Sequence, residues 1–308
     1  MIRPPIRATC RLRYTYPRFF GTGRLLLKDP RLQDFGRVLE DEYAKHSIVL
    51  AHGLLGFDEL RLAGPVFPGL QYWRGITDAL AKKGIDVIVA AVPPSGSIER
   101  RAERLCERVA QRANGKQVNI IAHSMGGLDA RYMISRLRPT EFKVLSLTTV
   151  ATPHHGSAFA DYVFDRIGPS RIKVLYNVLG QFGFETGAFS QLTREYMQGT
   201  FNPKTPDVED IKYYSYGASL EPSSLSIFGP SHKIIKRIEG GLNDGLVSVQ
   251  SSQWGEYQGT LLGVSHLDLI NWTNRLKWWI WSLTGGKKNF NAIAFYLDIC
   301  DMLAKKNL

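Results

Sequence analysis

The sequence predicts an α/β domain built around a mostly parallel sheet with helices on both faces. Short apolar runs alternate with helical segments through the first half of the chain. Continuous apolar runs are typical of strands covered on both sides, and this alternation is typical of parallel sheets. With 308 residues, the chain is long enough for one large α/β domain. The expected strands are 47–51, 85–92, 118–122 and 144–150, with weaker candidates at 211–217, 234–238 and 261–264.

Helices are expected between and after these strands. The clearest is 97–112, where Ser97 supplies a cap and apolar residues recur on one face. Arg101 and the other charged residues of this segment are interpreted as a solvated face. The remaining expected helices are 71–83, 128–137, 267–283 and 290–304.

Basic residues are concentrated at the N-terminus. Residues 1–28 hold seven of them and no acid, while the net charge of the whole chain is +11. Such a stretch is typical of a mitochondrial presequence, so we expect a leader over 1–28, a mitochondrial location and a single domain over 29–308. The alternatives are a basic tail on a cytoplasmic or lipid-associated protein, or an ordered strand. Because the excess charge lies in this leader, no nucleic-acid-binding face is expected.

Cysteine and hydropathy patterns narrow the class further. The three cysteines, Cys10, Cys106 and Cys300, show neither a disulfide framework nor a metal-binding spacing. No run of eighteen apolar residues occurs, so no transmembrane span is expected. We expect no metal and no cofactor.

The segment 158–212 differs from the rest of the chain. It is rich in aromatic residues and interrupted by glycines. We expect a helical insertion above the sheet, which serves either as a lid lining an acyl pocket or as an ordinary part of the core.

A candidate nucleophile follows the third expected strand. The segment 122–126, Ala-His-Ser-Met-Gly, fits a small-x-Ser-x-Gly pattern in which a strand turns into a helix at a strained serine. Side chains two positions before and after Ser124 would collide there unless they were small. The alternative is an ordinary serine at a strand-to-helix turn.

An attacking serine needs a base and an acid. A free hydroxyl is a poor nucleophile at neutral pH, so an imidazole must take its proton and a carboxylate must orient that imidazole. His266 lies in a loop between an expected strand and an expected helix, which favours it over His154, His155 and His232. Asp244 is the best acid, and its alternative role is that of a turn residue.

The tetrahedral intermediate also needs preorganised N–H donors. The Met125 N–H directly follows the nucleophile, and the Leu54 N–H lies in the glycine-containing loop after the first expected strand. We expect these two groups to form the oxyanion hole, with His52 bracing the loop.

Five segments together resemble the bacterial true lipases of the pseudomonad type and the mitochondrial triacylglycerol lipases of yeasts and fungi. They occur in the order found in those families and lie within 47–160 and 240–272. The segments are 48–58 (IVLAHGLLGFD), 118–127 (VNIIAHSMGG), 153–157 (PHHGS), 243–247 (NDGLV) and 265–268 (SHLD). The resemblance implies an α/β-hydrolase fold, a lid over the site, and the same triad and oxyanion donors as the residues themselves suggest.

Two features depart from that resemblance. Family members often carry a disulfide with a cysteine near Gln250, where this chain has none. They also often bind calcium through an aspartate matching Asp268, but no partner aspartate is evident upstream, and Trp272 stands where a further oxygen ligand would be expected. We therefore interpret Asp268 as an acid at a helix N-terminus.

The expected function is hydrolysis of acylglycerol esters through an acyl-enzyme, on a lipid substrate at a membrane or droplet interface. The same scaffold also serves phospholipases, thioesterases and acyltransferases, which the motifs do not separate. A non-catalytic lipid-binding protein is the alternative from another class, and an intact Ser, His and Asp argue against it.

Overall fold

The computed structural model describes residues 25–26, 46–54, 72–94, 96–166, 187–222, 226, 228–272 and 290–308. Their strands form one seven-stranded sheet in the order β1-β7-β6-β5-β4-β2-β3, and every neighbouring pair is parallel. The predicted α/β class with a parallel sheet is therefore confirmed. The strands are β1 (Leu25–Leu26), β2 (Ser47–Ala51), β3 (Val87–Ala90), β4 (Gln117–His123), β5 (Lys143–Val150), β6 (Lys212–Ser219) and β7 (Glu256–Leu262).

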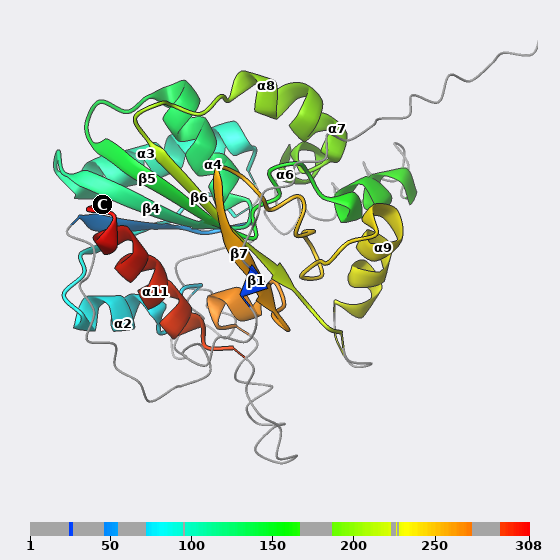
Figure 1. Cartoon of the computed structure of the whole chain (residues 1–308). Coiled ribbons are helices and arrows are strands. Elements are labelled where there is room, and N and C mark those ends of the chain that lie inside the picture. Colours follow the sequence, from blue (N-terminus) through cyan, green and yellow to red (C-terminus); the bar gives the residue numbers. More distant parts are fainter. Residues whose placement is uncertain are drawn as a thin grey trace, which may run out of the picture.

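Helices cover both faces of the sheet, because alternate residues of the buried strands point to opposite sides. Ile48 and Leu50 of β2 pack in one apolar cluster, and Val49 and Ala51 pack in another. The first cluster lies under α2 (Ile76–Lys82) and α11 (Ala292–Lys305) (Figure 1). The second lies under α3 (Ile98–Ala113), α4 (Gly126–Tyr132) and the π-helical turn η1 (Met133–Leu137).

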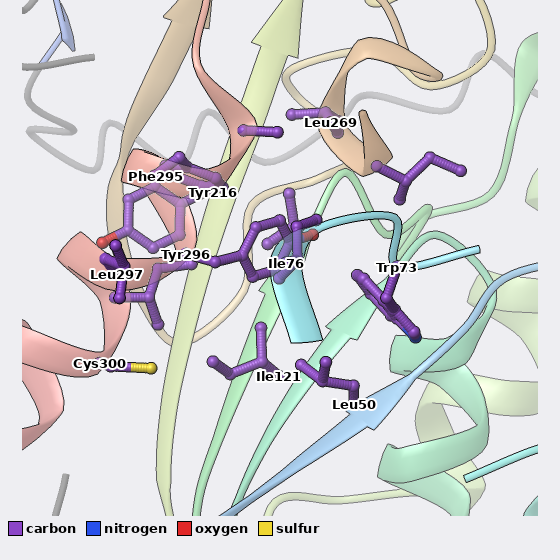
Figure 2. Close-up of a cluster of buried hydrophobic side chains, with 14 of the residues drawn as sticks. Leu50, Trp73, Ile76, Ile121, Tyr216, Leu269, Phe295, Tyr296, Leu297 and Cys300 are labelled. Atoms are coloured by element: carbon purple, nitrogen blue, oxygen red, sulfur yellow. The ribbon is translucent and has the colours of Figure 1, made fainter. Parts of the chain in front are cut away.

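Aromatic contacts hold α2 and α11 on their face of the sheet. The Trp73 ring meets the Tyr296 ring edge-on at 5.5 Å, and Phe295 meets Tyr216 of β6 in the same way at 5.1 Å. Figure 2 shows these side chains gathered above Leu50. Edge-to-face ring pairs contribute beyond their buried area, so this face is firmly packed.

Helices and helical turns make up much of the described insertion, whereas residues 205–211 are irregular. Residues 158–166 form a helix, followed after a gap by α6 (Gly187–Gln191), α7 (Arg194–Tyr196), the π-helical turn η2 (Met197–Phe201) and α8 (Asn202–Lys204). Residues 167–186 lie outside the described residues. The helical character expected for 158–212 is thus observed in those parts, and its role as a lid stays a prediction.

Four local predictions differ from the structure, and one is the expected strand 261–264, since β7 begins earlier and ends at Leu262. The expected strand 234–238 lies inside the helix α9 (Gly229–Glu239). The expected helix 71–83 begins only at Ile76, after a turn that buries Tyr72 and Trp73. The start of the expected helix 267–283 is a single 3-10 turn, η3 (Asp268–Ile270), and residues 273–289 lie outside the described residues.

The leader expected over 1–28 lies outside the described residues except for β1, which pairs with β7. Among the described helices, none is both long and apolar enough to span a bilayer.

Candidate active site

Ser124 lies at the sharp turn between β4 and α4. Its φ of 56° is in the left-handed region, which costs a non-glycine residue about 1–2 kcal/mol. Three hydrogen bonds hold it there: its N–H donates to Val150 O at 2.9 Å, and its carbonyl accepts from the Thr152 hydroxyl at 2.7 Å and from the Gly127 N–H at 3.1 Å. The strained backbone brings the half-buried serine to the carboxyl edge of the sheet.

Glycines around this turn are required by close approach. A Cβ on Gly126 would lie 2.5 Å from Ala51 O, and one on Gly127 would lie 2.2 Å from the Thr152 hydroxyl. A Cβ on Gly53 would lie 2.7 Å from the Ser124 Cβ. The turn is therefore packed directly against the end of β2, where the loop with the expected oxyanion donor begins.

The structure brings Asp244 and His266 together. Nδ1 of His266 lies 2.6 Å from Oδ2 of Asp244, and both side chains are buried. The other oxygen, Oδ1, accepts from the N–H groups of Leu246 and Val247 at 2.9 and 2.8 Å. The Asp244 carboxylate is thus fixed by three hydrogen bonds, and it can hold the imidazole with its Nε2 free to exchange a proton.

His266 also lies close to the serine turn. Its ring centroid is 4.6 Å from that of His123, the residue that precedes Ser124. Burial and the proximity of His266 lower the pKa of His123 well below its ordinary value. His123 is therefore neutral near pH 7.

The two expected oxyanion donors flank this turn. Met125 is fully buried, and its side chain packs in one cluster with that of Leu54. Within the described ranges, neither the Leu54 N–H nor the Met125 N–H donates a hydrogen bond to the protein. Among the described residues both N–H groups thus lack an acceptor, and each could donate to an oxyanion.

Arg101 is a residue beside the site whose role the sequence does not reveal. The expected solvated face of α3 is wrong at this position, because Arg101 is fully buried. Its guanidinium donates to His52 O at 2.9 Å and to Gly53 O at 3.2 Å, and it pairs with Asp129 of α4. It thereby ties the loop before Leu54 to the helix that follows Ser124. In the sequence, Arg101 lies beside the apolar stripe of α3, and this position is the feature that could have predicted its burial.

Tyr72 is a second residue that the sequence analysis did not single out. Its hydroxyl accepts from the Gly53 N–H at 3.0 Å and lies 2.7 Å from His123 Nδ1. Burial raises its pKa, so the hydroxyl keeps its proton, which it can donate to that nitrogen. His52 braces the same loop, since its Nε2 accepts from the Val92 N–H at 3.1 Å.

Asp268 has a local structural role. Its Oδ2 accepts from the N–H and the hydroxyl of Ser265 at 3.0 and 2.6 Å, at the start of η3. In the part of the chain that the structure covers, no group of His, Cys, Asp or Glu side chains is arranged to hold a metal ion.

Comparison with known proteins gives consistent relatives. Residues 95–215 match the family described as "Putative serine esterase (DUF676)". The chain is 37% identical to "Triacylglycerol lipase 2" of Saccharomyces cerevisiae, covering 85% of this chain and 92% of that protein. It is 25% identical to a triacylglycerol lipase of Pseudomonas fragi, covering 86% of this chain and 98% of that one.

Solved structures share the fold. A Bacillus licheniformis lipase superposes with a TM-score of 0.60 at 19% identity, covering 80% of this chain and 95% of that one. A metagenomic carboxyl esterase superposes with a TM-score of 0.66 at 18% identity, covering 88% and 80%. The resemblance inferred from the five sequence segments is thus confirmed.

Proposed function

The chain belongs to the triacylglycerol lipase family and has the α/β-hydrolase fold, and from that membership we propose that it hydrolyses acylglycerol esters at Ser124. His266 is the general base and acid, and Asp244 orients it. The observation that carries the assignment is the 2.6 Å contact between His266 Nδ1 and Asp244 Oδ2, next to the strained serine turn.

The proposed chemistry proceeds in two steps. His266 Nε2 takes the Ser124 proton while the serine oxygen attacks the ester carbonyl, and it then gives that proton to the leaving alcohol. Water repeats the sequence on the acyl-enzyme and releases the fatty acid. Asp244 holds the Nδ1–H tautomer and stabilises the imidazolium, which its three hydrogen bonds allow without side-chain movement.

The Leu54 and Met125 N–H groups bind the oxyanion of both tetrahedral intermediates. Such a donor contributes about 3–4 kcal/mol to the transition state when it is preorganised. Arg101 and Tyr72 support this role, because both hold the backbone of Gly53 next to Leu54.

The proposed setting is a lipid interface in mitochondria, with the insertion 158–212 as the cover of the acyl pocket. The basic composition of residues 1–28 supports import. Because β1 joins the sheet, processing is expected upstream of Leu25.

The test is a chain-length series of glycerides and soluble esters, together with a fluorophosphonate that labels activated serines. The wild type is expected to hydrolyse long-chain glycerides and to be labelled, while Ser124→Ala loses both properties. Ser135→Ala, further along the same helical segment, is the matched control and should retain both. Equal labelling of the Ser124→Ala variant would refute the proposed nucleophile, and a preference for phospholipids or acyl thioesters would change the substrate class.

A further inference from the structure

Two exposed apolar side chains flank one turn. Across the described residues, Ile238 and Leu242 are the only large hydrophobic residues that are exposed, at 40% and 52%. They lie on either side of Gly240, whose φ of 74° ends α9. Isolated exposed apolar residues are ordinary on a protein surface, but here both lie at the same place.

Three exposed cations accompany them on α9. Lys233, Lys236 and Arg237 are spaced by three and four residues, so they lie on one side of the helix. In the described ranges, none of them pairs with a carboxylate. The only acid of α9, Glu239, is largely buried and lies 3.9 Å from Arg194. The exposed side of α9 is therefore cationic with an apolar end.

This surface is attached directly to the candidate active site. Leu242 O accepts from the Val249 N–H, and Asn243 O accepts from the Leu220 N–H, both at 2.8 Å. Asp244, which holds His266, is the next residue. Figure 1 shows α9 in yellow beyond the carboxyl ends of the strands, on the same side as α6 and α7. Attachment of the protein through α9 would thus bring the carboxyl edge of the sheet, where the candidate active site lies, towards the surface to which α9 binds.

We propose that these five residues, Lys233, Lys236, Arg237, Ile238 and Leu242, form a docking surface for bilayers that contain anionic phospholipids. We call them the α9 surface. The cations bind the headgroups, and the two apolar side chains enter the boundary between headgroups and acyl chains. The inference rests on the proposed function, because it supplies the interface from which the enzyme takes its ester.

Charge and size favour a bilayer over a protein partner. The cations match the negative surface potential of anionic lipid, and apolar side chains beside them fit the interfacial layer. A stable protein interface buries about 800 Å² on each partner, whereas the described residues expose two large apolar side chains, Ile238 and Leu242. Weak, reversible attachment to lipid needs no larger patch.

The charge test uses the full chain and sedimentation with vesicles of phosphatidylcholine, alone or mixed with phosphatidylglycerol. The triple variant Lys233→Gln/Lys236→Gln/Arg237→Gln should bind the mixed vesicles at least about tenfold more weakly than wild type. The matched control is Lys82→Gln/Lys116→Gln/Lys143→Gln, whose exposed lysines lie at the opposite edge of the sheet. It should bind like wild type, and all variants keep the basic residues 1–28.

The apolar test uses Ile238→Ser/Leu242→Ser. This double variant should bind mixed vesicles about fivefold more weakly, and the difference should persist in 0.5 M salt, because burial of apolar area is not screened (a Debye length of about 4 Å applies there). In 0.5 M salt, the triple variant should bind mixed vesicles about as tightly as wild type does. Every variant of the α9 surface should hydrolyse a soluble short-chain ester at the wild-type rate, since none of these residues touches the catalytic groups.

Separate results decide the docking and the chemistry. The docking surface would be overturned if both α9 variants bound mixed vesicles as tightly as wild type does. It would also be overturned if wild type bound both kinds of vesicle equally. A dimer that the triple variant dissociates, with unchanged vesicle binding, would assign the surface to a second copy of the chain instead. Ser124→Ala should still bind mixed vesicles, so a failure of the soluble-ester assay in the wild type counts against the proposed function alone.

Discussion

Arg101 and Asp129 form an ion pair at 2.8 Å in which 0% and 1% of the two side chains are exposed. Burial raises the pKa of Asp129 to about 6, although the neighbouring Arg101 opposes this shift. Oδ1 of Asp129 has no hydrogen-bond partner among the described residues. The pair is therefore costly to bury, which suggests that the loop contacts of Arg101 are the reason it is present.

Replacing Arg101 should separate the contribution of its ion pair with Asp129 from that of its contacts with the loop before Leu54. Arg101→Met leaves Asp129 buried without its partner, and we expect a loss of about 3–5 kcal/mol in the free energy of unfolding. The double variant Arg101→Met/Asp129→Leu should recover most of that stability. Its kcat should stay about 10- to 100-fold below wild type, because the Gly53 carbonyl before Leu54 has lost its donor. Urea unfolding and soluble-ester kinetics check this, and wild-type kcat in the double variant would contradict it.

Asp244→Asn tests the orientation of the general base. The amide can still accept from the Leu246 and Val247 N–H groups, but it presents an NH₂ group to His266 Nδ1 and favours the wrong tautomer. We expect kcat to fall about 10⁴-fold with little change in KM. Steady-state kinetics on a soluble ester measure this. A fall below tenfold would remove Asp244 from the proposed triad.

Gly126→Ala tests the packing of the serine turn. Its Cβ would lie 2.5 Å from Ala51 O, a backbone atom that cannot move away cheaply. We expect a loss of about 1–3 kcal/mol in the free energy of unfolding, with reduced activity. Gly199→Ala is the matched control, because nothing lies within 4 Å of its added Cβ. It should be neutral or stabilising by up to about 1 kcal/mol, and equal effects of both variants would contradict the argument.

Three buried histidines should make stability depend on pH. Burial lowers the pKa of His52 to about 4 and the pKa values of His123 and His154 well below the ordinary range. Unfolding then takes up protons below about pH 6.5, so the free energy of unfolding decreases as the pH is lowered below that value. Asp129 acts in the opposite direction, because its raised pKa means that the folded state holds its proton more tightly than the unfolded chain does.

The net change is measurable by urea unfolding across a pH series. Between pH 7 and pH 5 we expect the free energy of unfolding to fall by about 3–5 kcal/mol. His154→Gln, which can still bond to the Thr149 hydroxyl, should reduce that fall by about a third. A free energy of unfolding that stayed constant or increased as the pH was lowered from 7 to 5 would show that these side chains are not buried as neutral groups.

The strands and the strand-to-helix turn at Ser124 are the most predictable features from the sequence. The apolar runs predicted β2, β4 and β5 to within one residue at each end, because a sheet covered on both faces leaves few places for polar residues. The prediction of a strand over 234–238 is wrong: three of its five residues are isoleucine, which is common in strands, but the other two are charged. Pro230 in the first turn and Gly240 in the left-handed region mark the helix that forms instead.

Contacts that join distant segments were not predictable from local pattern. Arg101 sits within a run of charges, and only its position against the loop of β2 and against Asp129 distinguishes it from its exposed neighbours. Tyr72 was assigned to an ordinary helix, whereas it bridges Gly53 and His123. Both roles depend on three-dimensional proximity that composition and periodicity do not encode.

The backbone of Ser124 has a consequence for engineering this chain. The Ser124→Gly variant would be relieved of the left-handed strain, about 1 kcal/mol, and would unfold at a higher temperature. It would also lack the oxygen that we propose as the nucleophile. A selection for thermal stability alone would therefore favour an inactive variant at this position. Screens for stabilised variants must measure activity as well as resistance to unfolding.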